Sequence, residues 1–234
     1  MVKALLIDIE GTTSSTHFVK EILFPYAAQQ LPAYLRNNPN NPQVKAAINE
    51  IATLASINAN DVESIIQQLL EWIKNDKKIT VLKTLQGLIW EEGYRKGDYK
   101  AHVYPDAYDH LKKWQQDNIP LYLYSSGSIK AQQLFFKFSD YGDIRYLFQN
   151  YFDTTSGHKK ESTSYHNIAK ALQRPCEEIL FLSDIVEELD AAKEAGMSTC
   201  WLVRKADTSA TEEQLNNPPH PTAESFSQIQ VSLD

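Results

Sequence analysis

Four short polar clusters follow apolar runs of the sequence and carry residue types that suit phosphate chemistry. In chain order, the clusters are Asp8 with Glu10, Ser125-Ser126-Gly127, Gly157-His158-Lys159-Lys160, and Asp184 with Glu187 and Glu188. Mg²⁺ prefers oxygen ligands such as carboxylates, and it usually keeps waters and substrate oxygens in its shell. Hydroxyls and backbone amides hold phosphate oxygens, and a lysine neutralises developing charge. The four clusters together predict a divalent cation beside a phosphate.

Each cluster taken alone also has an ordinary structural explanation. A carboxylate that closes a strand is more often a helix cap or a turn residue. The pair Lys159-Lys160 is typical of a solvated charged surface, and so is Glu187-Glu188 on a helix. Their joint occurrence, in order and at successive predicted strand ends, is what favours one shared site.

Short apolar runs before these clusters predict buried parallel strands. The runs cover residues 3–9, 121–124, 151–153, 179–182 and 199–203. Apolar residues at helical spacing lie between the later runs, for example Leu111 with Trp114 and Ile168 with Leu172. Alternating strands and helices predict a doubly wound parallel sheet, an α/β Rossmann-like core. Ligands bind such a sheet at the carboxyl ends of its strands, where the polar clusters fall.

The stretch between the first two predicted strands is too long for one crossover helix, and its pattern is helical. One apolar stripe at helical spacing consists of Val62, Ile65, Ile66, Leu69 and Ile73. Asn60 followed by Glu63 resembles a capping box at its start. We therefore expect a helical cap subdomain at 15–100, inserted into a catalytic core of 1–14 and 101–234. The polar, proline-rich stretch 205–221 is expected to be a surface loop.

Composition narrows the possible partners and location. The 234 residues include 23 basic and 30 acidic ones, for a net charge of −7, which disfavours a broad nucleic-acid-binding face. No apolar run approaches the length of a membrane span, and Asp8 ends the N-terminal apolar run too early for a signal peptide. Cys176 and Cys200 lack the CxxC spacing of a metal or redox motif. We expect a cytoplasmic monomer that binds neither nucleic acid nor membrane.

The clusters resemble the four motifs of the haloacid dehalogenase superfamily. Asp8-Ile9-Glu10-Gly11-Thr12 resembles the first motif, Asp-x-Asp-x-Thr, and Ser125 matches the second. Lys159 or Lys160 matches the third-motif lysine, and the stretch from Ser183-Asp184 through Asp190 matches the fourth. Glu188 falls where many members carry a second acid. The resemblance spans the chain and includes a cap inserted after the first motif.

Glu10 departs from the aspartate that most phosphatases of the superfamily carry. With this glutamate, the strings Asp-Ile-Glu-Gly-Thr-Thr, Tyr124-Ser125-Ser126-Gly127-Ser128 and Gly157-His158-Lys159 resemble the enolase-phosphatases of methionine salvage. In that family the lysine of Gly-His-Lys contacts substrate, which favours Lys159 over Lys160.

This resemblance implies a bifunctional reaction on a small phosphorylated diketone. The substrate would be 2,3-diketo-5-methylthiopentyl-1-phosphate, which is enolised and then dephosphorylated to 1,2-dihydroxy-3-keto-5-methylthiopentene. Asp8 would attack phosphorus, and one Mg²⁺ would be held by Asp8, Asp184 and the Glu10 backbone carbonyl. Glu10 would act as general acid and base in phosphate transfer.

Further roles follow from the same resemblance. Ser125 and Lys159 would hold the transferring group and Ser126 the diketone, with Glu188, Gly127 and Thr12 in a second rank. Glu10 is the candidate base for enolisation. Three aromatic residues after the first motif either line a pocket for the methylthio tail or are ordinary helix-packing residues: Phe18, Phe24 and Tyr26.

Three other functions share some of these features. A generic Mg²⁺-dependent phosphatase of the superfamily would carry all four motifs, and Glu10 argues against it. A haloacid dehalogenase would need no metal. A phospho-acceptor receiver module also places strand-end acids, a hydroxyl and a lysine around Mg²⁺, but it lacks a cap and is about half this length.

Overall fold

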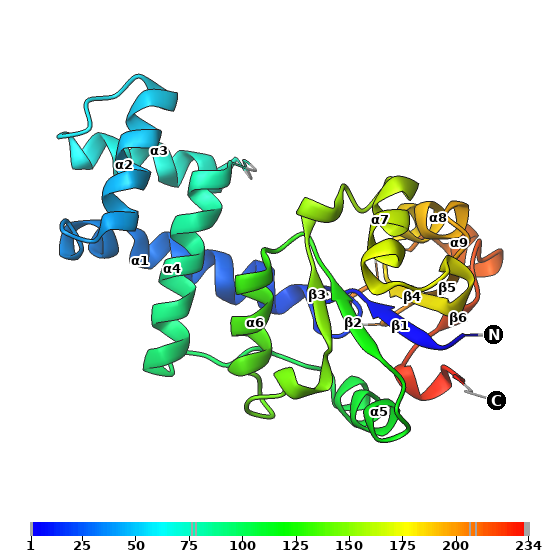
Figure 1. The fold of residues 1–234 in the computed structure, drawn as a ribbon. Coiled ribbons are helices and arrows are strands. Elements are labelled where there is room, and N and C mark those ends of the chain that lie inside the picture. Colours follow the sequence, from blue (N-terminus) through cyan, green and yellow to red (C-terminus); the bar gives the residue numbers. More distant parts are fainter. Residues whose placement is uncertain (1, 76, 78, 206, 209, 232–234) are drawn as a thin grey trace. The chain divides into compact units, whose positions relative to one another are not determined.

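A computed structural model describes residues 2–75, 77, 79–205, 207–208 and 210–231. The chain forms two compact units (Figure 1). One unit combines Met1–His17 with Lys100–Asp234, and the other is Phe18–Tyr99.

The first unit is built on a parallel sheet of six strands, in the order β3-β2-β1-β4-β5-β6. The strands are β1 Ala4–Ile7, β2 Leu121–Tyr124, β3 Asn150–Phe152, β4 Ile179–Ser183, β5 Ser198–Leu202 and β6 Thr222–Ala223. Every residue of β1, β2 and β4 is buried, as expected when helices cover both faces of a parallel sheet. The predicted α/β doubly wound fold is confirmed, and β6 is an additional short edge strand that the sequence pattern did not indicate.

Helices connect and cover these strands. They are α5 Pro105–Gln116, α6 Ile129–Lys137, α7 Ser162–Leu172, α8 Val186–Glu194 and α9 Glu212–Asn216, with 3₁₀ turns at Arg145–Leu147, Thr154–Ser156, Cys176–Glu178 and Phe226–Gln228. Helices α7 and α8 lie over one face of the sheet (Figure 1), where Ile168 and Leu189 share a buried core with Leu6 and Phe181. This packing fixes the direction in which the strand ends point.

The second unit, Phe18–Tyr99, is helical. It contains a π-helix at Phe18–Leu23, α1 Phe24–Asn37, α2 Pro42–Ala55, α3 Val62–Lys74 and α4 Thr80–Lys96. The apolar stripe expected in α3 contributes Ile65, Ile66 and Leu69 to the unit's own core. The unit thus has a hydrophobic core separate from that of the sheet.

The segment just before the helical unit belongs to the sheet unit. Ser15 N donates to His102 Nδ1 at 3.1 Å, and the hydroxyls of Ser15 and Thr16 both donate to Asp207 Oδ1 at 2.9 Å. Residues 15–17 therefore lie with the sheet unit, although we expected the inserted segment to begin at 15.

The capping box predicted at Asn60 and Glu63 is wrong. Asp61 caps α3, and its carboxylate accepts bonds from Ser64 N at 3.1 Å and Ser64 Oγ at 2.7 Å. Glu63 instead pairs with Arg36 at 2.7 Å. An aspartate is as good an N-cap as an asparagine, so residue type alone does not decide which of Asn60 and Asp61 caps the helix.

The stretch 205–221, expected to be a loop, contains the short helix α9. Thr211 and Gln214 form a capping box at its start, a signal that was present in the sequence. Among the described residues, no helix is both long and apolar enough to cross a membrane.

Candidate active site

The predicted site residues lie just beyond the carboxyl-terminal ends of neighbouring strands. Asp8 follows β1, Ser125 follows β2, and Asp184 follows β4. Strand β1 pairs with β2 on one side and β4 on the other, so the strand order reverses here. In open α/β sheets this switch point is where ligands bind.

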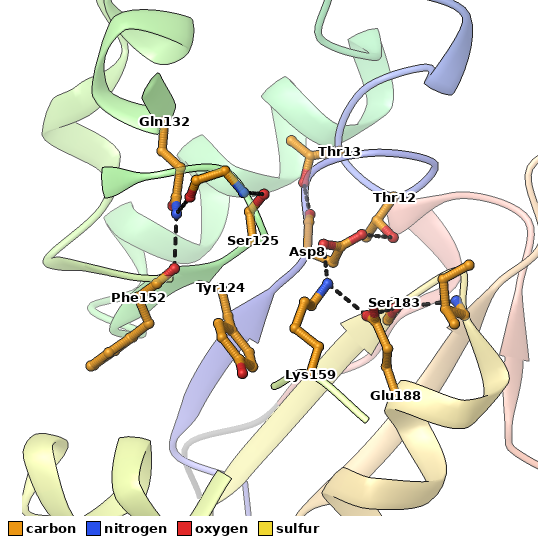
Figure 2. A network of polar contacts seen from close by, with 12 residues as sticks. Asp8, Thr12, Thr13, Tyr124, Ser125, Gln132, Phe152, Lys159, Ser183 and Glu188 are labelled. Atoms are coloured by element: carbon orange, nitrogen blue, oxygen red, sulfur yellow. Dashed lines mark hydrogen bonds and ion pairs between the residues drawn. The ribbon is translucent and has the colours of Figure 1, made fainter. Parts of the chain in front are cut away.

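A buried lysine connects two of the predicted acidic residues. Lys159 Nζ lies 2.5 Å from Asp8 Oδ1 and 2.6 Å from Glu188 Oε2, and all three side chains are buried (Figure 2). Ser183 Oγ donates to Glu188 Oε2 at 2.9 Å. Glu188 is therefore held from two sides, in the first turn of α8, whereas its neighbour Glu187 is exposed.

A tight turn after β1 fixes Asp8. The backbone amides of Thr12, Thr13 and Ser14 all donate to Ile9 O. Thr13 Oγ1 donates to Asp8 O at 2.7 Å, and Thr12 Oγ1 lies 3.5 Å from Asp8 Oδ2 (Figure 2). The hydroxyls of this turn thus hold both the backbone and the carboxylate of Asp8.

Gly11 permits the close approach of this turn to Asp184. Its φ is +75°, and a Cβ at this position would lie 2.2 Å from Asp184 Oδ2. Any larger residue would push the two loops apart. Position 11, directly after Glu10, therefore needs glycine so that Asp184 can approach the site.

Hydrogen bonds to backbone carbonyls position Lys159. Tyr124 Oη donates to Gly157 O at 3.0 Å, Tyr165 Oη donates to Lys159 O at 2.6 Å, and Ser164 Oγ donates to His158 O at 2.7 Å. Three consecutive carbonyls are thus fixed by buried side chains. We did not predict a role for Tyr124, Ser164 or Tyr165, because a tyrosine or serine near a strand end gives no sequence signal for such a bond.

The cluster carries more negative than positive charge. Burial raises the pKa of Asp8 well above its ordinary value, and the Glu188 and Asp184 carboxylates reinforce this rise against the opposing Lys159 ammonium. Burial likewise raises the pKa of Asp184 to about 7, with Glu188 adding to the effect. Burial alone would lower the pKa of Lys159, but the two acids outweigh it and hold that pKa above its ordinary value. Three acids around one ammonium favour the arrival of a further cation.

The donor set fits a hard divalent cation. Asp184 Oδ1 is buried and has no hydrogen-bond partner among the described residues, and the Asp184 carboxylate lies near enough to Asp8 to raise the pKa of Asp8. The described residues contain no group of three or more His, Cys, Asp or Glu side chains arranged to hold a metal. Mg²⁺ needs no such group, because one or two carboxylates with waters and substrate oxygens complete its shell.

The loop after β2 presents a serine hydroxyl and backbone amides. Ser125 is buried, its N donates to Phe152 O at 3.2 Å, and its Oγ accepts from Gly127 N at 3.1 Å. Accepting this bond uses a lone pair and leaves the hydroxyl hydrogen to donate to a phosphate oxygen. Ser125 follows β2 and Asp8 follows β1, and these two strands are paired (Figure 2).

The other predicted residues lie at the surface or elsewhere. Glu10 is exposed, forms a β-bridge with Ser14, and is near enough to Asp184 to raise the pKa of Asp184. Ser126 is exposed as well. Lys160 is exposed and lies 3.7 Å from Glu187, so the structure separates the two candidate lysines.

The three aromatic residues after the first motif make ring contacts inside the helical unit. Phe18 and Tyr26 pack edge-on against Tyr99, with ring centroids 6.2 and 4.8 Å apart, and Phe24 packs against Trp90 at 5.8 Å. Tyr26 Oη also donates to Asp98 at 2.6 Å. Each of the three rings therefore packs against another aromatic side chain of the same unit.

Known proteins similar to this chain include several with the name Enolase-phosphatase E1. The sequence model of the haloacid dehalogenase-like hydrolases matches residues 2–196. The Enolase-phosphatase E1 of Pseudomonas savastanoi pv. phaseolicola is 56% identical over 87% of this chain and 89% of its own length. The Enolase-phosphatase E1 of Pseudomonas aeruginosa strain LESB58 is 49% identical over 98% of this chain and 99% of its own length.

The solved structures of two known proteins are also similar to this chain. The crystal structure of the UTR4 protein (Unknown transcript 4 protein) of Saccharomyces cerevisiae aligns with a TM-score of 0.82 and 32% identity, over 98% of this chain and 100% of that chain. CbbY from Rhodobacter sphaeroides, in complex with phosphate, aligns with a TM-score of 0.60 at 15% identity, over 97% of this chain and 96% of that chain, which shows a shared fold alone. With relatives 49% and 56% identical over most of its length, the chain belongs to the enolase-phosphatase family of haloacid dehalogenase-like hydrolases.

Proposed function

We propose that this chain is the enolase-phosphatase of methionine salvage and acts on 2,3-diketo-5-methylthiopentyl-1-phosphate. The products are 1,2-dihydroxy-3-keto-5-methylthiopentene and phosphate. The observation that carries the proposal is the buried pair of Asp8 and Lys159 at 2.5 Å, next to Asp184 at the switch point of the sheet. A carboxylate nucleophile, a fixed ammonium and a second carboxylate are the groups that phosphate transfer through an acyl phosphate requires.

Phosphate transfer takes two displacements in this proposal. An Asp8 carboxylate oxygen attacks phosphorus, the bond from phosphorus to the substrate oxygen breaks, and Glu10 gives that oxygen a proton. Glu10 then takes a proton from water, whose oxygen attacks phosphorus, and the bond to Asp8 breaks. The exposed position of Glu10 is consistent with access to both the leaving oxygen and water.

Two sides of the site hold the transferring group in this proposal. Lys159 supplies a fixed positive charge from the loop before α7, and Ser125 supplies a hydroxyl from the loop after β2, where Ser126 would contact the diketone. Charge stabilisation of this kind is commonly the largest single contribution to such a reaction. Glu188 keeps Lys159 in place through the 2.6 Å contact.

Enolisation needs a base near the α-carbon of the diketone, and we assign it to Glu10. The base removes the α-proton, and the electron pair of that C–H bond becomes the enol double bond while a carbonyl oxygen gains charge. The charged oxygen takes a proton from water, and the resulting enol phosphate then enters the phosphate-transfer steps above, with Glu10 still carrying the α-proton that it gives to the leaving oxygen.

Asp8, Asp184 and the Glu10 backbone carbonyl would hold one Mg²⁺ ion. When bound, this ion supplies the positive charge that lets a phosphate dianion approach the carboxylates. The partnerless Asp184 Oδ1 and the surplus of acids in the cluster, both within the described part of the chain, support this assignment.

The proposal also covers the helical unit and the state of the protein. We propose that Phe18–Tyr99 acts as the cap that encloses the methylthio tail, and that the enzyme is a cytoplasmic monomer. The aromatic cluster of that unit supplies apolar surface of the kind such a tail requires.

The test is release of phosphate from the diketone phosphate over many turnovers, with Mg²⁺ and with EDTA. We expect turnover with Mg²⁺ and its loss in EDTA, restored by excess Mg²⁺. A panel of other small phosphate esters separates this function from that of a generic phosphatase, since enolisation needs a carbonyl next to an acidic C–H. Equal rates on all esters would contradict the proposal, and so would full activity in EDTA.

A further inference from the structure

Gln132 is a buried polar side chain whose role the reaction above does not use. It lies in α6 with only 2% of its surface exposed. Its neighbour Gln133 is exposed. A buried amide costs free energy unless hydrogen bonds offset that cost, so its contacts are informative.

The Gln132 amide nitrogen binds two backbone carbonyls from different elements. Nε2 donates to Gly127 O at 2.8 Å and to Phe152 O at 2.8 Å (Figure 2). Gly127 belongs to the loop after β2, and Phe152 is the last residue of β3. The side chain therefore ties the β2 loop to the end of the neighbouring strand.

Both of these residues are also the partners of Ser125. Phe152 O accepts from Ser125 N at 3.2 Å, and Gly127 N donates to Ser125 Oγ at 3.1 Å. The Gln132 amide thus binds both Phe152, which orients the Ser125 backbone, and Gly127, which orients the Ser125 hydroxyl. Few arrangements of this loop satisfy all four bonds together.

The other end of the amide indicates why glutamine is present. Gln132 Oε1 is buried and has no hydrogen-bond partner among the described residues. A buried acceptor without a partner weakens the fold, so the amide gives stability only through its two donor bonds. An apolar side chain of similar length would fill the same space without an unpaired acceptor. The two donor bonds are therefore the reason for a glutamine at this position.

We propose that Gln132 is a positioning residue for phosphate binding, acting through Ser125. This inference rests on the proposed function, in which Ser125 holds the transferring phosphate. By fixing Gly127 and Phe152, Gln132 keeps the Ser125 hydroxyl aimed at the phosphate site. A displacement of about 1 Å in such a group costs on the order of 100-fold in rate.

The test is a double-mutant cycle of Gln132→Met with Ser125→Ala, with Gln133→Met as the matched control on the same helix. Methionine keeps the length and flexibility of glutamine but has no donor. We expect Gln132→Met to lower kcat/KM for phosphate release about 10- to 100-fold and Gln133→Met to leave it unchanged. In the Ser125→Ala background, Gln132→Met should cost less than about threefold more, because the group that it positions is gone.

Single-turnover rates with enzyme in excess keep the weak variants measurable. Calorimetric titration with inorganic phosphate and Mg²⁺ adds a readout that does not depend on the diketone, and we expect Gln132→Met to weaken phosphate binding. Circular dichroism checks folding. If Gln132→Met does not fold, Gln132→Leu takes its place in the cycle, since leucine is a good helix former for a buried position and has no donor either.

Wild-type activity in Gln132→Met would overturn the inference. A loss in the double variant equal to the product of the losses in the two single variants would also overturn it. The proposed function has a separate outcome: it fails if the wild-type chain does not convert the diketone phosphate. Phosphate binding by wild type and variant still tests Gln132 in that case.

Discussion

The two sides of the site are held in place by different kinds of contact. On the side of β1 and β4, buried charges dominate, with Lys159 between Asp8 and Glu188. On the side of β2 and β3, neutral hydrogen bonds join Ser125, Gly127, Phe152 and Gln132. Removing one member of a buried ion pair leaves an uncompensated charge, whereas removing a neutral donor leaves an unpaired neutral acceptor, which costs less free energy. The charged side should therefore be the less tolerant of substitution.

The largest effect should come from Asp8, the proposed nucleophile on the charged side. Asp8→Asn keeps the shape of the side chain but cannot form a stable acyl phosphate, so phosphate release should fall by several orders of magnitude. Enolisation needs no nucleophile, so slow exchange of the substrate's α-proton with solvent deuterium should remain. NMR of the substrate in D₂O measures this exchange.

Glu10→Gln is the matched variant for that experiment, and it should lose both half-reactions. Exchange that persists in Glu10→Gln and vanishes in Asp8→Asn would reverse the two assignments and make Asp8 the enolising base. Circular dichroism of both variants confirms that they are folded before the rates are compared.

The next largest effect should come from the lysine. Lys159→Ala removes the ammonium that faces Asp8 and Glu188, and kcat should fall about 100-fold or more. Lys160→Ala, next to it but exposed, should change kcat little. Steady-state phosphate release measures both, at a temperature where thermal unfolding shows each variant folded. The reverse order of the two losses would contradict the choice of lysine.

The neutral side should give a smaller effect. Ser125→Ala removes one hydroxyl donor, while the Ser125 backbone bond to Phe152 remains, so we expect kcat/KM to fall about 10- to 100-fold with an unchanged melting temperature. A loss larger than that of Lys159→Ala would show that the neutral side, and not the charged side, is the less tolerant of substitution. Parallel kinetics and calorimetric melting of the two variants decide this.

The smallest effect should come from the two cysteines. Burial raises the pKa of the Cys200 thiol to about 11 and also raises the pKa of Cys176. Since a raised pKa keeps a thiol protonated, neither is a thiolate at pH 7, and alkylation by iodoacetamide should become fast only as the pH rises toward that range. The double change Cys176→Ser with Cys200→Ser should leave kcat within a few-fold. A loss of about 1000-fold in the folded variant would reveal a thiol role.

The order of apolar runs and polar clusters was enough to predict the parallel sheet and to place the candidate site residues at the carboxyl ends of its strands. Asp8 and Ser125 directly follow runs of buried apolar residues, and Asp184 follows such a run after Ser183, so the strand pattern alone aligned them. Lys159 could be separated from Lys160 in the sequence only by the family resemblance, because two adjacent lysines have the same local pattern. In the structure, burial makes the distinction.

Other features depend on contacts between distant residues, which no local pattern contains. Gln132 looks like an ordinary polar residue of an amphipathic helix, and its two carbonyl partners are known only once β2 and β3 are paired. The short strand β6 was missed because two residues carry too little periodicity. The cap of α3 was placed one residue early because Asn60 and Asp61 are both good caps.

The pairing of β1 has a consequence for the order in which the protein assembles during synthesis. Strand β1 is translated first, but its registers are with Leu121–Leu123 and Ile179–Leu182. At about 5–20 residues per second, the ribosome reaches the second of these partners roughly 9–35 s after β1 is made. For roughly the first 6–23 s of that interval, until β2 is made, the apolar segment β1 has no partner strand, whereas helices α1–α4 find their contacts within Phe18–Tyr99. The nascent chain should therefore need chaperone protection most at β1.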